Sequence, residues 1–156
     1  MLVNQLRRYG VLIAIVAIIA VIAVVGVAFR DRFGSNASEL VVGDCFDLPG
    51  TGLTVENVQH HPCTEAHTAE VFAVFKHPAA KGDAYPGTVT LRSYGADGCV
   101  APFASYVGIS KDETALDIGW FRPTEEGWKV GDRAFTCYLT NGDQSAMTQS
   151  MKGSKQ

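Results

Sequence analysis

The pattern of hydrophobic and polar positions divides the chain into two contrasting parts. Residues 9–29 form an apolar run of 21 residues without a charged side chain, whereas apolar and polar residues are mixed throughout the rest of the chain. At about 1.5 Å of rise per residue, a helix of this length spans roughly 31 Å, which matches the ~30 Å hydrocarbon core of a bilayer. The pattern therefore predicts a transmembrane helix over residues 9–29.

A cleaved signal peptide is the main alternative for this run. Residues 1–8 are basic, and the small residues at 26–28 or 35–37 could form a cleavage site. However, the apolar core of a signal peptide is usually about 7 to 15 residues long. This run is longer, and Arg30 and Arg32 follow it as a stop-transfer flank. The sequence therefore favours an uncleaved, single-pass membrane anchor.

Strand patterns dominate the part that follows the apolar run. Residues 30–39 are predicted to form a short polar tether, and residues 40–143 a folded domain. Within this domain, residues 70–75 are apolar on both faces, which is typical of a central strand, and residues 53–59 are a weaker strand candidate.

Two later segments predict an antiparallel hairpin. In residues 116–120 and again in residues 133–140, apolar and polar positions alternate with the period of two that a strand requires. The segment between them contains Pro123 and Gly127 and predicts a turn-rich loop at the tip of the hairpin.

One segment of the domain has helical spacing, because Cys99, Phe103 and Val107 fall on one face of a helix. Pro102 interrupts this pattern. A proline costs about 3 kcal/mol inside a helix but little within its first turn. We therefore expect a break near Gly98 and a new helix that starts at Cys99 or at the residue after it.

Together these patterns predict a small α+β domain. It should contain an antiparallel sheet of about four strands with one helical segment packed on it. Residues 144–156 are rich in Ser, Lys, Gln and Gly, so we expect them to form a mostly disordered, flexible tail.

The cysteines indicate how the chain is oriented in the membrane. The basic residues that flank the apolar run are nearly balanced, so they leave the direction open. All four cysteines lie after the run, and an even number in so small a domain is typical of a chain exported into an oxidising compartment. We therefore expect residues 1–8 in the cytoplasm and the chain from Asp31 onward outside the cytoplasmic membrane.

The charge of the exported part excludes one class of partner. Residues 33–156 carry 9 Lys and Arg against 15 Asp and Glu, which gives a net charge of −6. An acidic domain repels phosphate backbones, so nucleic acid is not expected to bind.

Four cysteines can pair in three ways. Cys137 faces inward on its predicted strand and Cys99 faces inward on the predicted helix, so a bridge between them needs no rearrangement. Cys45 then pairs with Cys63. The loop-entropy model assigns about 3 kcal/mol to the bridge with the shorter loop and about 4 kcal/mol to the longer one.

The sequence carries no catalytic signature: Gly-x-Ser-x-Gly, His-Glu-x-x-His and a glycine-rich phosphate loop are all absent. We therefore predict that the protein is not an enzyme and uses no cofactor. The alternative rests on His60, His61 and His67, which lie close to Cys63 and are potential metal ligands. On this alternative the chain is a His-based metal-binding protein or a cell-wall enzyme that uses these three histidines. Otherwise the three histidines are simply exposed to solvent or act as capping residues. Trp128 is either a clamp on the hairpin or, if exposed, a binding anchor.

Several short motifs resemble those of a known family. They are Val42-Gly43-Asp44-Cys45-Phe46, Ala66-His67 with Glu70-Val71-Phe72, Tyr85-Pro86-Gly87, Trp128 with Gly131-Asp132-Arg133, and Ser150-Met151-Lys152-Gly153. Residues 40–153 thereby resemble the septum formation domain of actinobacterial envelope proteins. Members of this family commonly have an N-terminal membrane anchor, and the family name links them to septation. The family supplies no catalytic residues.

The resemblance and the residues lead to one functional prediction. We expect a membrane-anchored binding or scaffolding module outside the cytoplasmic membrane that contacts envelope or cell-division proteins. Trp128 and the motif residues His67 and Glu70 are the candidate interaction residues.

Overall fold

The computed structural model describes residues 13, 15–20, 37–48 and 58–156. The chain forms two compact units, residues 1–33 and 34–156. In the first unit, the described residues 13 and 15–20 are helical. The remainder of the predicted helix over residues 9–29 lies outside the described residues, as do residues 1–8. Among the residues that are described, no helix has the length and apolar character needed to cross a bilayer.

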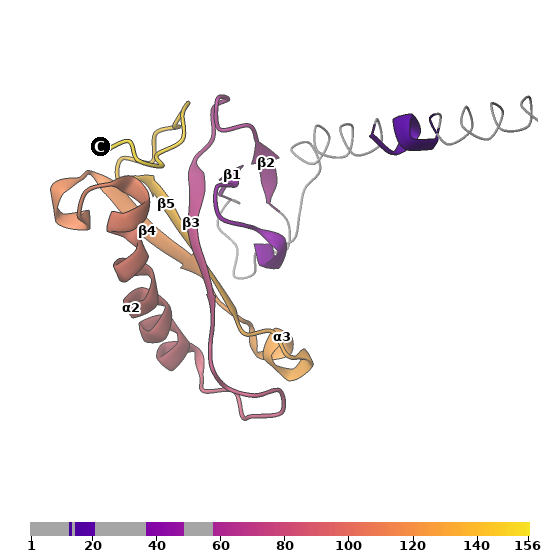
Figure 1. Cartoon of the computed structure of the whole chain (residues 1–156). Coiled ribbons are helices and arrows are strands. Elements are labelled where there is room, and N and C mark those ends of the chain that lie inside the picture. Colours follow the sequence, from indigo (N-terminus) through magenta and orange to yellow (C-terminus); the bar gives the residue numbers. More distant parts are fainter. Residues whose placement is uncertain (1–12, 14, 21–36, 49–57) are drawn as a thin grey trace, which may run out of the picture. The chain divides into compact units, whose positions relative to one another are not determined.

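The second unit is built on a five-stranded antiparallel sheet (Figure 1). Its strands are β1 (Cys45–Asp47), β2 (Gln59–His61), β3 (Ala69–Lys76), β4 (Leu116–Phe121) and β5 (Ala134–Asn141), in the order β2-β1-β3-β5-β4. Its helices are η1 (Ala37–Glu39), α2 (Thr88–Val107), η2 (Lys111–Glu113) and α3 (Glu125–Val130).

The predicted α+β class is confirmed, but the sheet has five strands where about four were expected. The difference arises at β1 and β2, which have three residues each and are too short to show a period-two pattern. The weaker strand candidate over residues 53–59 lies mostly outside the described residues, and β2 begins at its last position, Gln59.

Helix α2 runs from Thr88 to Val107 without interruption and contains Pro102, so the predicted break near Gly98 is wrong. The helix places a continuous buried face on the sheet, with Leu91, Gly95, Cys99, Phe103, Tyr106 and Val107. Burial contributes about 0.8 kcal/mol per methylene group, so this face offsets the cost of a single proline. At Gly98 the ring of Phe75 approaches closely, because a Cβ built there would lie 2.2 Å from Cζ of that ring.

The predicted hairpin is present, since β4 and β5 pair from Leu116 opposite Asn141 to Phe121 opposite Thr136. Its tip is helix α3, where an irregular loop was expected. The side chain of Thr124 caps α3 by accepting a hydrogen bond from the backbone N–H of Gly127 at 3.0 Å. At the other end, Gly131 adopts φ 106° and terminates the helix. Of the predicted turn residues, Pro123 precedes the short helix and Gly127 lies within it, while Thr124 and Gly131 cap its ends.

The sheet is covered by apolar clusters on both faces. Successive side chains of a strand point to opposite faces, and in β3 the neighbours Val71 and Phe72 belong to different clusters. One cluster joins the sheet to α2 and includes Phe103. The other joins the sheet to the segment before β1 and includes Leu40 and Phe46. Packing on both faces explains why β3 is apolar on both sides.

The folded unit extends past both predicted ends of the domain. Ala37 lies in η1 and is buried, so the end of the expected tether over residues 30–39 belongs to the fold. The expectation of a mostly disordered tail over residues 144–156 is wrong, because Met147 and Met151 are buried in the α2 cluster. The backbone there is also bonded, since the N–H of Gly153 donates to the carbonyl of Tyr106 at 2.8 Å. The two methionines and these backbone hydrogen bonds anchor an otherwise polar segment.

Both disulfides join the pairs that the sequence predicts, Cys45 with Cys63 and Cys99 with Cys137. The first ties β1 to the segment that follows β2, and the second ties α2 to β5. Each bridge therefore connects elements that are distant in the sequence.

Candidate functional site

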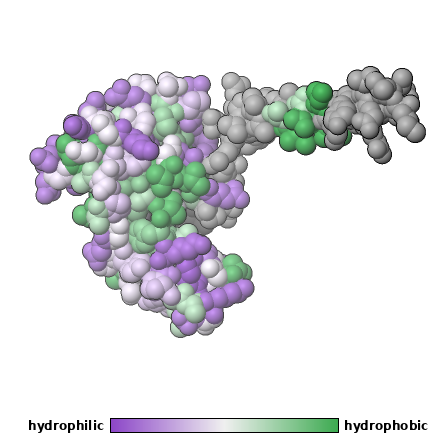
Figure 2. Space-filling view, in the orientation of Figure 1, coloured by the Kyte–Doolittle hydropathy of each residue, from purple (hydrophilic) through white to green (hydrophobic). Residues whose placement is uncertain are grey.

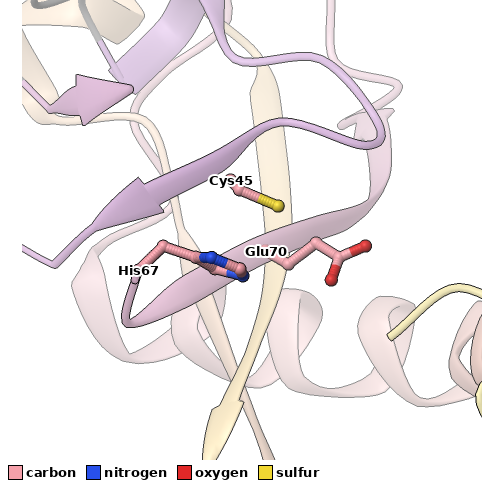
Figure 3. Close-up of side chains that lie close together, drawn as sticks. All are labelled: Cys45, His67 and Glu70. Atoms are coloured by element: carbon pink, nitrogen blue, oxygen red, sulfur yellow. The ribbon is translucent and has the colours of Figure 1, made fainter. Parts of the chain in front are cut away.

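Three chemically capable side chains meet where β1 pairs with β3 (Figure 3). Cys45 on β1 lies opposite Glu70 on β3, and His67 lies two residues before β3. One potential ligand atom of each lies within 4.8 Å of the other two, and all three residues are buried. Because the sulfur of Cys45 is already bonded to Cys63, it is not available as a metal ligand while the disulfide is intact.

Glu70 is fully buried and its carboxylate accepts three hydrogen bonds. Its Oε1 accepts from the hydroxyl of Tyr106 at 2.7 Å and from that of Ser150 at 2.5 Å. Its Oε2 accepts from the backbone N–H of Met151 at 2.6 Å. A buried carboxylate needs such donors to offset its lost hydration. Burial and the adjacent Glu70 in turn raise the pKa of Tyr106 well above its usual range.

Only one of the two ring nitrogens of His67 has a hydrogen-bond partner among the described residues. Its Nδ1 lies 2.8 Å from the carbonyl oxygen of Glu65. A carbonyl oxygen can only accept, so Nδ1 carries the proton and Nε2 is left as an acceptor in the neutral ring. Among the described residues, the buried Nε2 atom has no hydrogen-bond partner. One nitrogen of this buried ring is thus left without a hydrogen-bond partner among the described residues.

The structure does not bring His60, His61 and His67 together as one set of metal ligands. His60 and His61 are successive residues of β2, so their side chains point to opposite faces of the sheet. Nδ1 of His60 lies 4.0 Å from the carboxylate of Asp44, and Nε2 of His61 lies 2.8 Å from that of Asp47. The prediction of a shared metal site assumed that histidines close in the sequence lie close in space. In a strand, adjacent residues point to opposite faces, so this assumption fails here.

Trp128 lies inside the fold and is only 2 % exposed, so it is a clamp rather than a surface anchor. Its indole N–H donates to the carbonyl of Asp83 at 2.8 Å. The guanidinium of Arg133 lies 3.6 Å from the ring centre, and Arg133 is itself buried. The Arg133 side chain also donates hydrogen bonds to the backbone carbonyls of Ala79, Ala80, Trp128 and Asp132. This cluster fastens α3 to the loop after β3.

All three candidate interaction residues are therefore interior. Trp128, His67 and Glu70 are each 2 % exposed or less, so none of them can contact a partner on the folded domain. Sequence reasoning selected His67 and Glu70 because they belong to motifs, and Trp128 because an exposed tryptophan can be a binding anchor. A motif residue in a small domain is as readily a packing or hydrogen-bonding residue as a contact residue.

An accessible concave surface lies beside the β4–β5 hairpin, on the sheet face away from α2. This groove has a volume of about 500 Å³ and is lined by Leu48, Thr68, Asp117, Ile118, Gly119, Tyr138, Thr140, Asn141, Gly142 and Gln144. The ring of Tyr138 lies directly over Gly119, where a Cβ would meet the ring at 2.4 Å. Burial raises the pKa of Tyr138. The groove thus combines an aromatic floor with polar side chains that can form hydrogen bonds.

No sequence pattern singles out the groove residues, because they come from four separate segments of the chain. One signal was present. A glycine in the middle of an alternating strand, here Gly119, marks a place where another group approaches the backbone closely.

Apolar side chains also reach the surface of this unit. In the view of Figure 2, an apolar area is bordered by polar residues. Val41 and Val42, in the turn before β1, are 46 % and 50 % exposed, and Val74 on β3 is 41 % exposed. Scattered exposed apolar side chains of this kind are normal on a protein surface.

Comparison with known families identifies the domain as a whole. Residues 42–156, nearly three quarters of the chain, match the model of the septum formation family. The chain belongs to this family. Comparison with curated proteins and with solved structures gave no significant match.

Membership in the septum formation family confirms the resemblance carried by the short motifs and links the protein to septum formation. The matched region contains all five strands, both disulfides and the hydrogen bonds of Glu70. It also includes the C-terminal segment, in agreement with the packing of Met147 and Met151.

Proposed function

We propose that this protein is a membrane-anchored, extracytoplasmic binding module of the cell envelope that serves septum formation by contacting cell-division or wall-building proteins. Its membership in the septum formation family is the observation that carries the link to septation. The domain acts by non-covalent contact and not by catalysis.

Two features support the location. The apolar run over residues 9–29 has the length of a bilayer-spanning helix. The domain behind it contains two disulfides, which persist in oxidising compartments. In this arrangement the anchor keeps the domain at the outer surface of the cytoplasmic membrane.

The contrast between polar side chains that bond inside the fold and polar side chains that line the groove supports a binding role. The carboxylate of Glu70 is saturated by three internal donors, and the donors of Arg133 are directed at backbone carbonyls. These groups stabilise the fold. The groove beside β4 and β5, by contrast, presents Asp117, Thr140 and Gln144 to the surroundings. We assign it as the contact surface for the partner.

Proximity labelling in dividing cells tests the process. The full chain, fused to a labelling enzyme active outside the cytoplasm, should concentrate at septa and label division and envelope proteins. A uniform membrane distribution without labelled envelope proteins would contradict the proposal.

Charge reversal tests the contact surface. Asp117→Lys combined with Thr140→Arg places two positive charges in the groove, and this variant should lose its labelled neighbours while remaining folded and in the membrane. Asp97→Lys is the matched control, because Asp97 is an exposed acidic residue of α2 outside the groove. If the groove variant still labels the same proteins, the groove is not the contact surface.

A further inference from the structure

The two disulfides differ in how a dissolved thiol can reach them. Cys99 and Cys137 are fully buried, so both sulfurs of that bridge are shielded. In the other bridge, Cys45 is 1 % exposed whereas Cys63 is partly exposed on the segment after β2. Of the four cysteines, Cys63 is therefore the one whose sulfur an incoming thiol can approach.

The buried end of the same bridge faces an unusual environment. A ring nitrogen of His67 lies within 4.8 Å of the sulfur of Cys45 and of the carboxylate of Glu70 (Figure 3). The Nε2 atom of His67 is buried and, among the described residues, makes no hydrogen bond. The ring of His67 therefore lies beside the buried sulfur, with a carboxylate next to it.

We infer that the Cys45–Cys63 disulfide is a thiol-exchange site, in which a thiol attacks Cys63 and Cys45 leaves beside His67. The substrate class is a low-molecular-weight thiol or the reactive cysteine of a dithiol oxidoreductase. This role is independent of the proposed contact with division proteins.

The chemistry of the step balances without another reactant. The attacking sulfur forms a bond to Sγ of Cys63, the Sγ–Sγ bond breaks, and its electron pair remains on Sγ of Cys45. The incoming thiol is oxidised to a mixed disulfide and Cys45 is reduced. The proton released by the incoming thiol ends on Cys45 or on His67, where the imidazolium pairs with the thiolate.

His67 sets the direction of the attack. A thiolate in an apolar interior is destabilised by its lost hydration. A neighbouring imidazolium favours the thiolate, and a stabilised leaving thiolate departs faster. The sulfur of the partly exposed Cys63 is thus attacked, and the sulfur of the buried Cys45 is the leaving group.

The first test uses the full chain in detergent, with reduced glutathione as the thiol. After quenching with N-ethylmaleimide, peptide mass spectrometry should find glutathione on Cys63, a blocked free thiol at Cys45 and an intact Cys99–Cys137 bridge. Glutathione on Cys45, or opening of both bridges at the same rate, would overturn the inference.

The second test compares His67→Gln with His60→Gln. His60 is the matched control, because it is also a buried histidine with an unpartnered Nε2 but lies outside the group with Cys45. Exchange at Cys63 should become about tenfold slower in His67→Gln and stay near the wild-type rate in His60→Gln. Equal rates in the two variants would overturn the role of His67. If His67→Gln fails to fold, both its bridges open together, and the position of glutathione in the wild-type chain decides the inference.

Discussion

Tyr106 on α2 and Glu70 on β3 are 36 positions apart in the sequence and share a 2.7 Å hydrogen bond in the interior of the domain. Ser150 and Met151 complete the bonding of the same carboxylate from the C-terminal segment. One buried charge therefore joins a strand, the main helix and the end of the chain. A small domain gains from such a junction because its core alone stabilises it only modestly.

The carboxylate of Glu70 should be essential for stability. In Glu70→Gln, an amide N–H₂ replaces one of the two acceptor oxygens and faces a donor, so at least one buried donor loses its partner. The free energy of unfolding should fall by about 2 to 4 kcal/mol. Urea denaturation of the full chain in detergent, followed by tryptophan fluorescence, measures this loss. Glu65→Gln, at an exposed position, is the control, and equal stability of the two variants would contradict the prediction.

Stability should decline at high pH through Tyr106. Burial, together with Glu70, raises its pKa above the usual 10.0, so the folded state keeps the phenol proton where the unfolded chain loses it. The stabilisation is complete below about pH 10 and is lost as the pH rises towards the folded-state pKa. Urea denaturation between about pH 8 and 11 should show a smaller decline in Tyr106→Phe than in the wild type. Tyr138 titrates in both proteins, so a parallel decline in the two would refute the assignment to Tyr106.

Deletion of residues 150–156 should destabilise the domain. The deletion removes two of the three donors to Glu70 and the buried side chain of Met151. The unfolding free energy should decrease by about 3 kcal/mol or more, because a buried charged acceptor loses its partners. Removal of Gln156 alone is the control, since this exposed residue bonds only to Ser154 nearby. A deletion variant as stable as the control would restore the idea of a flexible tail.

Gly98 should tolerate no side chain. In Gly98→Ala the new Cβ would lie 2.2 Å from Cζ of Phe75, so the helix or the ring must move. Overpacking costs about 1 to 3 kcal/mol, which exceeds the gain of about 1 kcal/mol in helix propensity. Thermal unfolding followed by circular dichroism measures the difference. Ser93→Ala, on the exposed face of α2, should change stability by less than about 0.5 kcal/mol, and a stabilised Gly98→Ala would show that the ring can move.

The sequence predicted correctly those elements whose signal lies within a few neighbouring residues. The strands β4 and β5 were predicted from alternation of apolar and polar positions, and β3 from a short run that is apolar on both faces, because such local patterns report burial directly. The disulfide pairing was predicted because inward-facing positions on two elements, at Cys99 and Cys137, restrict the choice.

Several failures concern long-range packing. Local propensity places a break at Pro102, but the contact of α2 with the sheet decides the helix. The polar composition of residues 144–156 suggests a free tail, but its order depends on Glu70, 80 positions before Ser150. The group formed by Cys45, His67 and Glu70 likewise depends on the pairing of β1 with β3. A carboxylate within an apolar strand was the one local sign that distant donors had to exist.

The C-terminal bonds to Glu70 also impose an order on biogenesis. A chain is synthesised from its N-terminus, so β3 and its buried carboxylate are made long before Ser150 and Met151 follow. Until those residues arrive, the carboxylate lacks two of its three donors and the sheet is held by an incomplete interior. The domain can therefore reach its final form only after the segment that carries these residues has been synthesised, which makes the completion of folding a late event.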